Sequence, residues 1–285
     1  MAILAAVSYA NDTSQCLSNA FGENIWSNVT KRTVQVAGFT KMYDDVTAYI
    51  AVSHSNKQIV YSFRGTTNAL QLIQQLEIIV TPAVEFPAGG RVQKYWYDGI
   101  EAVNLALLDD LTTLIDNNPN YEILVTGHSL GAALASEAAA LLSYNSPQIR
   151  DRIILYTFGQ PRVGYLDYAD AHNKLVNNSY RVVHYNDIVV HLPPCDTDFF
   201  KTECNTDGPY HHGIEVFYDA IDMPRDADFK VCLGPPPNED AQCSDSNSIV
   251  FSCVYDMPQC ASSHNHYFNI NLSKFEVDLN CKIPQ

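Results

Sequence analysis

The chain has 285 residues, of which 46% are apolar and only 17% charged, so we expect a folded protein with a large core. Its formal net charge of −15 argues against binding to nucleic acid and against electrostatic docking to anionic lipid. Any attraction to a lipid surface therefore has to be hydrophobic. No apolar run approaches the roughly 20 residues of a membrane span. Since single α/β domains often reach this length, we expect one domain, 1–285.

The cysteines and glycosylation sequons favour a secreted protein. Eight cysteines lie between Cys16 and Cys281, and no Cys-x-x-Cys pair occurs, so a zinc or redox motif is poorly supported. Asn-x-Ser/Thr sequons stand at Asn11, Asn28, Asn177 and Asn271. Sequons beside an even number of cysteines are typical of the oxidising secretory pathway.

The apolar segment Ala2–Ala10 has two interpretations. It lacks the basic flank of a signal peptide, and Cys16 follows it closely. We therefore expect it to be the first helix of a mature chain whose signal peptide has been removed. A retained signal peptide is the alternative.

The first strands and helix follow in chain order. Val46–Val52 and Gln58–Phe63 are β-branched and aromatic runs separated by a polar turn, which predicts a hairpin. Ala69–Val80 has helical periodicity with glutamines opposite an apolar stripe, which predicts an amphipathic helix. The stripe consists of Ala69, Leu72, Ile73, Leu76, Ile79 and Val80.

Further along the chain, strands and helices alternate. We expect helices at Tyr95–Asp116 and near Tyr165–Val176, and strands at Ile153–Phe158, Tyr180–Tyr185 and His212–Tyr218. This alternation predicts a mostly parallel sheet with helices on both faces. After the last strand, about 45 residues rich in Pro, Asp, Ser and Cys predict a loop region that needs disulfides to hold its shape.

Residues 121–135 carry the strongest chemical signal. A short apolar strand, Ile123–Val125, runs into Gly127-His128-Ser129-Leu130-Gly131, and small helix formers then continue to Leu142. Strand, Gly-x-Ser-x-Gly and helix in this order predict a nucleophile elbow, in which the serine stands on a tight turn at a helix N-terminus.

A nucleophilic serine needs a histidine to take its proton and an acid to orient that histidine. Asp187 is the favoured acid, because it follows a strand whose end lies on the face where the serine is displayed. The acids at 151 and 167 stand near helix starts, where a cap is the ordinary role. A histidine on a loop that reaches back over the serine favours His264 or His266, and physical reasoning does not separate the two.

The chain resembles the class 3 lipases, the fungal-type triacylglycerol lipases and their secreted animal relatives, over nearly its whole length. The resemblance rests on segments in the correct order: Ser62-Phe63-Arg64-Gly65-Thr66, Thr126-Gly127-His128-Ser129-Leu130-Gly131, Phe158-Gly159-Gln160-Pro161-Arg162-Val163-Gly164, Arg181-Val182-Val183-His184-Tyr185-Asn186-Asp187-Ile188-Val189, Leu192-Pro193-Pro194 and Tyr210-His211-His212-Gly213-Ile214-Glu215-Val216. It implies an α/β-hydrolase fold. The family's catalytic histidine precedes two variable residues and Tyr-Phe, which here identifies His264 as the base.

The resemblance also implies the parts around the triad. The oxyanion hole would consist of the N–H of Leu130 and of Thr66, whose N–H and hydroxyl could both donate. The amphipathic helix would belong to a lid at 67–85 that hides its apolar face in water and presents it at a lipid interface. The family's terminal clasp implies a Cys16–Cys281 disulfide, and a family loop closed by its own bridge implies Cys232–Cys243, which leaves Cys195–Cys204 and Cys253–Cys260.

Together these observations predict a secreted serine carboxylic ester hydrolase with a Ser129, Asp187 and His264 triad, acting on acylglycerols at a lipid–water interface. The mechanism requires no metal and no organic cofactor. An esterase or phospholipase on the same fold, including a feruloyl-type esterase, is the alternative, because a fold does not fix a substrate. A lipid-binding relative that has lost catalysis is the alternative from another class.

Overall fold

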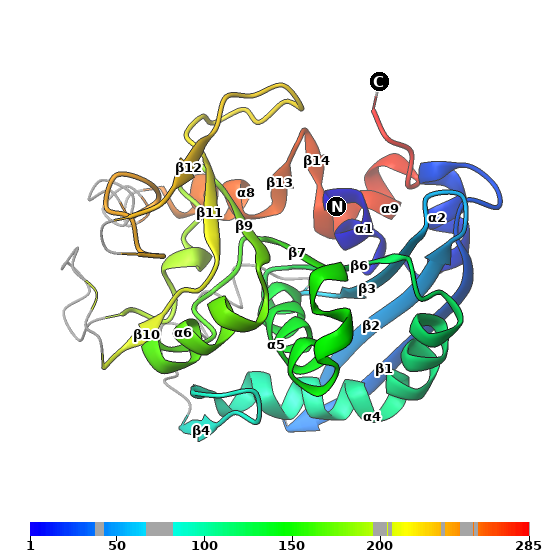
Figure 1. The fold of residues 1–285 in the computed structure, drawn as a ribbon. Helices are drawn as coiled ribbons and strands as arrows, with labels where there is room; N and C mark the ends of the chain where they lie inside the picture. Colours follow the sequence, from blue (N-terminus) through cyan, green and yellow to red (C-terminus); the bar gives the residue numbers. More distant parts are fainter. Residues whose placement is uncertain are drawn as a thin grey trace.

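An eight-stranded sheet forms the centre of the computed structural model, which describes residues 1–37, 43–66, 82–195, 204, 207–234, 237–245, 253 and 256–284 (Figure 1). The strand order is β1-β2-β3-β6-β7-β9-β11-β12. The strands are β1 (Ser27–Ala37), β2 (Tyr43–Ser53), β3 (Gln58–Phe63), β6 (Glu122–His128), β7 (Ile153–Phe158), β9 (Asn178–His184), β11 (Ile214–Tyr218) and β12 (Lys230–Cys232).

The middle of this sheet is parallel, as the sequence predicts. Strands β3, β6, β7, β9 and β11 run in one direction, whereas β1, β2 and β12 pair antiparallel at the two edges. Since parallel strands end at the same edge of a sheet, the residues after β3, β6, β7 and β9 gather there. This edge brings together segments that are far apart in the sequence.

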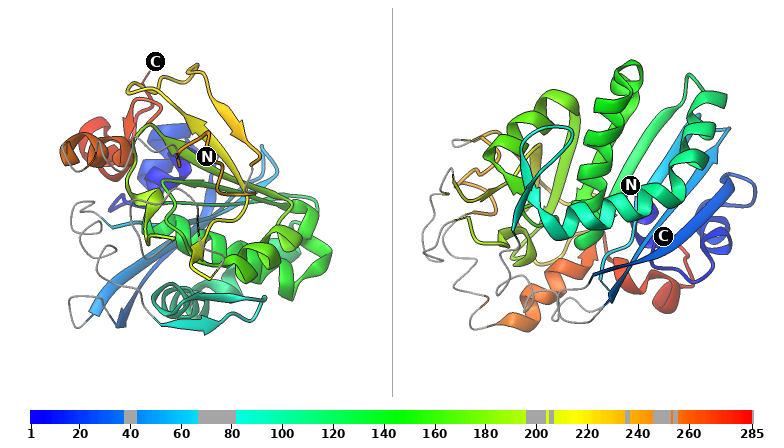
Figure 2. Two further views of the ribbon diagram at one scale, coloured as in Figure 1. Left: turned by 90° about the vertical axis from the view of Figure 1, so that its left-hand side faces the viewer. Right: turned by 90° about the horizontal axis from the view of Figure 1, so that it is seen from below.

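Helices cover both faces of the sheet, which confirms the predicted layering (Figure 2). On one face, α4 (Lys94–Asn117), α5 (Leu130–Asn145) and α6 (Leu166–Leu175) bury the larger core. On the other face, α1 (Ala2–Val7), α2 (Thr13–Phe21) and α9 (Phe275–Leu279) bury a second core. None of the helices within the described ranges combines the length and the apolar character that crossing a bilayer requires.

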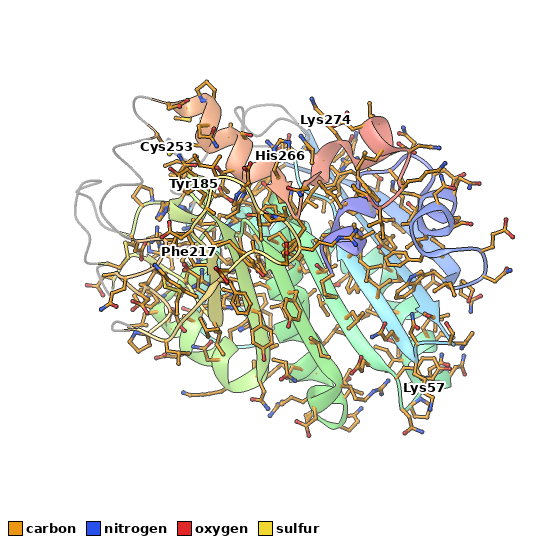
Figure 3. All side chains as sticks on the ribbon, turned by 90° about the horizontal axis from the view of Figure 1, so that it is seen from above. Lys57, Tyr185, Phe217, Cys253, His266 and Lys274 are labelled. Carbon is orange, nitrogen blue, oxygen red and sulfur yellow. A yellow bond between two sulfur atoms is a disulfide. The ribbon has the colours of Figure 1, made fainter. Side chains whose placement is uncertain are left out.

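Short elements complete the described chain. A second sheet contains β4 (Ala83–Glu85), β5 (Arg91–Gln93), β8 (Gly164–Tyr165) and β10 (Pro209–Tyr210), and a small hairpin joins β13 (His266–Tyr267) to β14 (Ile270–Asn271). Helix α8 (Met257–Asn265) precedes that hairpin, and 3₁₀ turns lie at Pro147–Arg152, Val189–His191 and Leu272–Lys274. The C-terminal segment with Cys253 and His266 passes beside Tyr185, just beyond the end of β9 (Figure 3).

Most predicted elements agree with the structure, and a few differ. The hairpin and the helices and strands of the parallel region are confirmed, but the first helix ends at Val7 rather than Ala10. Strand β1 was not predicted, because its polar residues outnumber its apolar ones at an exposed edge. Strand β12 and helix α8 lie within the region expected to be loop. The expected lid at 67–85 lies outside the described residues except for its end, where Ala83–Glu85 form β4.

Four disulfides join the cysteines in the pairing that the family resemblance implies: Cys16–Cys281, Cys195–Cys204, Cys232–Cys243 and Cys253–Cys260. The first ties α2 to the segment after α9, and so holds the two ends of the chain together on the second core. The other three close short loops in the C-terminal half.

Glu137 is an ionisable residue in the larger core. It lies on α5, its side chain is fully buried, and neither carboxylate oxygen has a hydrogen-bond partner among the described residues. Burial, and to a lesser degree the charge of Asp98, hold the pKa of Glu137 well above its usual value. Folding therefore favours the protonated form, and this residue opposes folding increasingly as the pH rises from the unfolded-state pKa towards the higher folded-state pKa.

We expect Glu137→Met to raise the free energy of unfolding at pH 8 by about 1–3 kcal/mol, because it removes a buried polar group without a partner at similar volume. The gain should be smaller at pH 4, where the carboxyl group is protonated in both states. Chemical denaturation at the two pH values measures both quantities. Glu23→Met, at an exposed position, is the control and should show no such pH dependence. An equal gain at both pH values would contradict the prediction.

Candidate active site

Ser129 stands on the turn between β6 and α5, as the nucleophile elbow predicts. Its backbone has φ 61° and ψ −129°, in the left-handed region that few residues other than glycine adopt. The N–H of Ser129 donates to the carbonyl of Phe158 at the end of β7, at 2.9 Å. This strained turn lifts the serine out of the strand and begins the helix directly after it.

The two glycines of the motif permit this turn. A Cβ atom on Gly127 would lie 2.2 Å from the carbonyl oxygen of Gly131, and one on Gly131 would lie 2.3 Å from that of Phe63. Both distances are far below van der Waals contact. Only glycine therefore lets helix α5 start this close to strands β3 and β6.

The structure brings Ser129, His264 and Asp187 together. The Ser129 hydroxyl lies 2.8 Å from His264 Nε2, and His264 Nδ1 lies 2.9 Å from both carboxylate oxygens of Asp187. All three side chains are buried. The carboxylate can only accept, so Nδ1 carries the ring proton and Nε2 is free to accept the proton of the serine hydroxyl. This is the arrangement of a serine nucleophile, its base and an orienting acid.

Asp187 is held in place by further donors. Its carboxylate accepts from the N–H of Val189 at 2.9 Å and from the hydroxyl of Tyr267 at 3.1 Å. Burial alone would raise the pKa of Asp187, but the charge of His264, the hydrogen bond from His264 and that from the Val189 N–H hold it below the usual value. The acid therefore stays ionised. Sequence reasoning missed Tyr267, although it lies in the Tyr-Phe pair that identifies the histidine.

Gly159 makes room for this pair. It follows β7 with φ 58°, and a Cβ atom there would lie 2.7 Å from an oxygen of Asp187 and 2.8 Å from His264 Nδ1. A side chain at this position would therefore collide with the hydrogen bond between the acid and the base. In the sequence, Gly159 stands out only as part of the family segment Phe158–Gly164, without a sign of this role.

His128 forms a hydrogen bond with the backbone of His264. The His264 carbonyl can only accept, so His128 Nε2 donates to it at 2.7 Å, and Nδ1 accepts from the Tyr9 hydroxyl at 2.8 Å. The two imidazole rings lie 4.7 Å apart, centre to centre. Burial and the nearby His264 lower the pKa of His128 to about 3. His128 is therefore neutral at physiological pH and does not oppose a positive charge on His264.

Other histidines and acids of the chain make different contacts. His266 Nδ1 donates to the carbonyl of Ser262 at 2.9 Å. His191 contacts Asp245, and Asp167 pairs with Arg91. Of the two histidines that sequence reasoning left open, the structure thus places His264, and not His266, against Ser129 and Asp187.

Leu130 and Gly65, the residue before Thr66, lie next to the serine. Leu130 follows Ser129 directly and begins α5. Phe63 at the end of β3 pairs with Gly127 in β6, so the residues after Phe63 reach the turn of the elbow. A Cβ atom on Gly65 would lie 3.1 Å from that of Ser129, so Thr66 directly follows a residue that contacts the serine.

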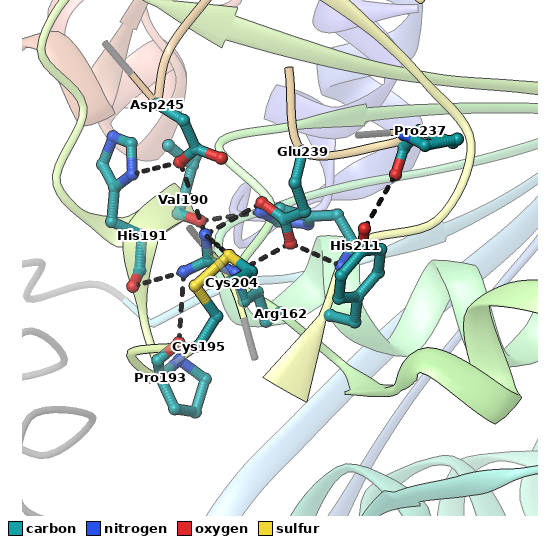
Figure 4. Close-up of a disulfide and its surroundings, with 11 residues drawn as sticks. Arg162, Val190, His191, Pro193, Cys195, Cys204, His211, Pro237, Glu239 and Asp245 are labelled. Atoms are coloured by element: carbon teal, nitrogen blue, oxygen red, sulfur yellow. Dashed lines mark hydrogen bonds and ion pairs between the residues drawn. A yellow bond between two sulfur atoms is a disulfide. The ribbon is translucent and has the colours of Figure 1, made fainter. Parts of the chain in front are cut away.

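Arg162 anchors the segment that follows Asp187 (Figure 4). Its buried guanidinium forms two hydrogen bonds of 2.9 Å with Glu239 and donates to the carbonyls of His191 and Pro193. Asp245 lies 3.4 Å from Arg162 and 3.1 Å from His191. Since both carboxylates raise the pKa of Arg162 despite its burial, this cation is permanent and fixes the segment electrostatically.

Two clusters of metal-ligand type occur among the described residues. One contains Glu215, Cys232 and Cys243, and the other contains Cys204, Glu239 and Asp245. The cysteines of both clusters are in disulfides, so neither offers a thiolate. Glu215 pairs with Arg181, and Glu239 pairs with Arg162.

Comparison with known proteins agrees with this geometry. Residues 60–197 match the family model for Lipase (class 3). The chain is 33% identical to a lipase of Caenorhabditis elegans over 288 residues, which cover 95% of this chain and 78% of that lipase. The chain belongs to the class 3 lipase family.

This class 3 lipase is also 32% identical over 169 residues to the secreted mono- and diacylglycerol lipase A of Penicillium cyclopium, covering 56% of this chain and 53% of that protein. It therefore spans about half the length of that relative. A solved structure, the lipase from Rhizopus microsporus var. chinensis, matches with a TM-score of 0.72 and 26% identity over 95% of this chain and 86% of that chain. The fold is that of the α/β hydrolases, and the lipase is a serine hydrolase.

We expect Gly159→Ala to reduce kcat at least about 10²-fold, because the added methyl group displaces the acid and base from their geometry. Turnover of a soluble p-nitrophenyl ester measures this loss. Gly22→Ala is the matched control, since Gly22 also has a positive φ but its Cβ position meets nothing closer than 3.8 Å. The control should keep its activity. Equal activity of both variants would show that the site tolerates the methyl group.

Proposed function

We propose that this protein is a secreted, single-domain triacylglycerol lipase that works through Ser129, His264 and Asp187. The observation that carries the proposal is the continuous chain of hydrogen bonds from the serine hydroxyl through both ring nitrogens to a buried carboxylate. Family membership and the names of the relatives support ester hydrolysis. The disulfides support secretion, because such bonds persist in oxidising compartments.

In the first half of the reaction, the Ser129 oxygen attacks the ester carbonyl while His264 Nε2 takes the hydroxyl proton. A bond forms between the serine oxygen and the carbonyl carbon, and the carbonyl oxygen becomes an anion. Asp187 stabilises the imidazolium through Nδ1. The neutral state of His128 matters at this step, because a second cation 4.7 Å from the imidazolium would raise the barrier.

The oxyanion is assigned to the backbone N–H groups of Leu130 and Thr66. Each such donor contributes on the order of 3 kcal/mol to stabilising the transition state. The tetrahedral intermediate then expels the alcohol, which receives the proton from His264 Nε2, and leaves an acyl group on Ser129. Water, activated by the same nitrogen, attacks the acyl-enzyme and releases the fatty acid.

The proposed substrate is an acylglycerol at a lipid–water interface. Ser129 is 1% exposed, so an ester reaches it only after the structure opens. The apolar stripe of the segment Ala69–Val80 would supply both the opening and the hydrophobic docking that a protein of net charge −15 requires.

We expect Ser129→Ala and His264→Ala each to lower kcat by about 10⁶-fold, because the members of a triad act as a unit. His266→Ala, the matched control two residues away, should retain most of the activity. Hydrolysis of a soluble ester by the purified variants, with folding checked by circular dichroism, measures these effects. Inactivation by His266→Ala, together with retained activity of His264→Ala, would reverse the assignment of the base.

The substrate class is tested by comparing a dispersed short-chain triacylglycerol below and above its solubility limit. A lipase that opens at an interface should show a sharp increase in rate when droplets appear. Smooth saturation below the limit, without such an increase, would indicate an esterase. Ser129→Ala run beside the wild type excludes a contaminating hydrolase.

A further inference from the structure

A β-bulge lies at the start of β1 and contains one of the sequons. Ser27 pairs with Val52 and Thr30 pairs with Ile50, so Asn28 and Val29 together stand opposite the single residue Ala51. Asn28 has φ 50° and is exposed. The bulge thus gives the sequon Asn28-Val29-Thr30 a conformation that differs from that of a regular strand.

The bulge also places Asn28 on the same face of the sheet as Trp26. Ala51 faces the second core, and Val29 packs against that core. Trp26 also packs against the second core. It directly precedes Ser27, the residue that pairs with Val52. Asn28 follows Trp26 by two residues, so their Cα atoms lie within about 7 Å of each other at the start of β1.

Trp26 borders an open groove of about 370 Å³. Its lining includes the apolar and aromatic side chains of Leu4, Phe21, Tyr156 and Trp26, and the polar side chains of Gln58 and Glu122. The Trp26 Nε1–H is buried and donates to no atom of the described residues. A ligand with one apolar face and hydroxyl groups around its edge would suit this mixed lining.

Asn28 differs from Asn11 and Asn271, two of the other three sequon asparagines, in the hydrogen bonding of its side chain. The Asn11 amide donates to Glu276 at 3.0 Å, and the Asn271 side chain accepts from Ser273 at 3.0 Å. The exposed Asn28 side chain forms no hydrogen bond with the described residues. Asn177 is exposed as well, but the residue two positions before it is Leu175 rather than an aromatic residue.

We propose that Asn28 carries an N-linked glycan whose first N-acetylglucosamine packs on the Trp26 indole and occupies the mouth of this groove. The inference rests on the secretion that the proposed function includes. Asn28 Nδ2 loses a proton and forms a bond to C1 of the sugar, while the lipid-linked pyrophosphate donor leaves with the electrons of its C1–O bond. The C–H face of the sugar ring covers the part of the indole that borders the groove.

The chemistry of the groove fits this occupant. A pyranose ring presents axial C–H bonds on one face and hydroxyl groups around its edge, which matches a lining of aromatic and polar side chains. A sugar on the indole removes apolar surface from water without burying a charge. The glycan would therefore stabilise the fold at this edge, at the ends of β3 and β6 opposite to the serine.

The test uses the full chain secreted from a eukaryotic host. Peptide mass mapping, with enzymatic deglycosylation in heavy water, reports the occupancy of Asn28. The glycans are then trimmed to one N-acetylglucosamine, and acrylamide quenching of tryptophan fluorescence is compared with that of Asn28→Gln. The chain has two tryptophans, and Trp96 is 1% exposed, so quenching reports on Trp26. We expect Asn28→Gln to be quenched more strongly.

Asn177→Gln is the matched control and should leave the quenching unchanged. Thermal unfolding provides the second readout: the sugar should raise Tm by about 2 °C or more in the wild type and not in Trp26→Leu. An unoccupied Asn28 would overturn the proposal. So would equal quenching of the wild type and Asn28→Gln, or the same gain in Tm in both tryptophan backgrounds. Esterase activity stays intact in each of these outcomes, which separates them from failure of the proposed function.

Discussion

The site depends on backbone segments that approach one another more closely than a methyl group permits. At Gly127 and Gly131, strand β6 and helix α5 pass with no space for a Cβ atom. Gly159, after β7, has no side chain and so leaves room for the contact between Asp187 and His264. These contacts determine how closely the segments around Ser129, His264 and Asp187 approach one another. The rest of the sheet serves to hold these segments at that spacing.

In the proposed mechanism, His264 is the group that becomes positively charged, and its neighbours are arranged to favour this. Asp187 is a permanent anion held by Val189 and Tyr267, and His128 is kept neutral by burial. Arg162 is permanently charged, but its carboxylate partners neutralise it within their own cluster. The protein therefore separates structural charges from the charge that changes during turnover. This separation explains why so many ionisable groups coexist in a small buried volume.

The parallel half of the fold could be predicted from the sequence because its strands are continuous apolar runs bounded by turns. Ile153–Phe158 is predicted to the residue. The elbow and Asp187 could be predicted for a related reason, since each directly follows such a strand. The choice between His264 and His266 could not be made from physical reasoning, because it depends on how α8 ends and where β13 begins. Strand β1, and the roles of Tyr9, His128 and Tyr267, depend on long-range contacts without any local signal.

The disulfide between Cys16 and Cys281 has a mechanical consequence. It joins positions separated by 265 residues, and every strand of the large sheet lies between them. A stretching force applied to the two ends would pass through this covalent bond and would not shear the strands apart. Only the short segments outside the bridge could extend until the bond is reduced. The catalytic framework would thus behave as a closed ring that transmits tension without unfolding.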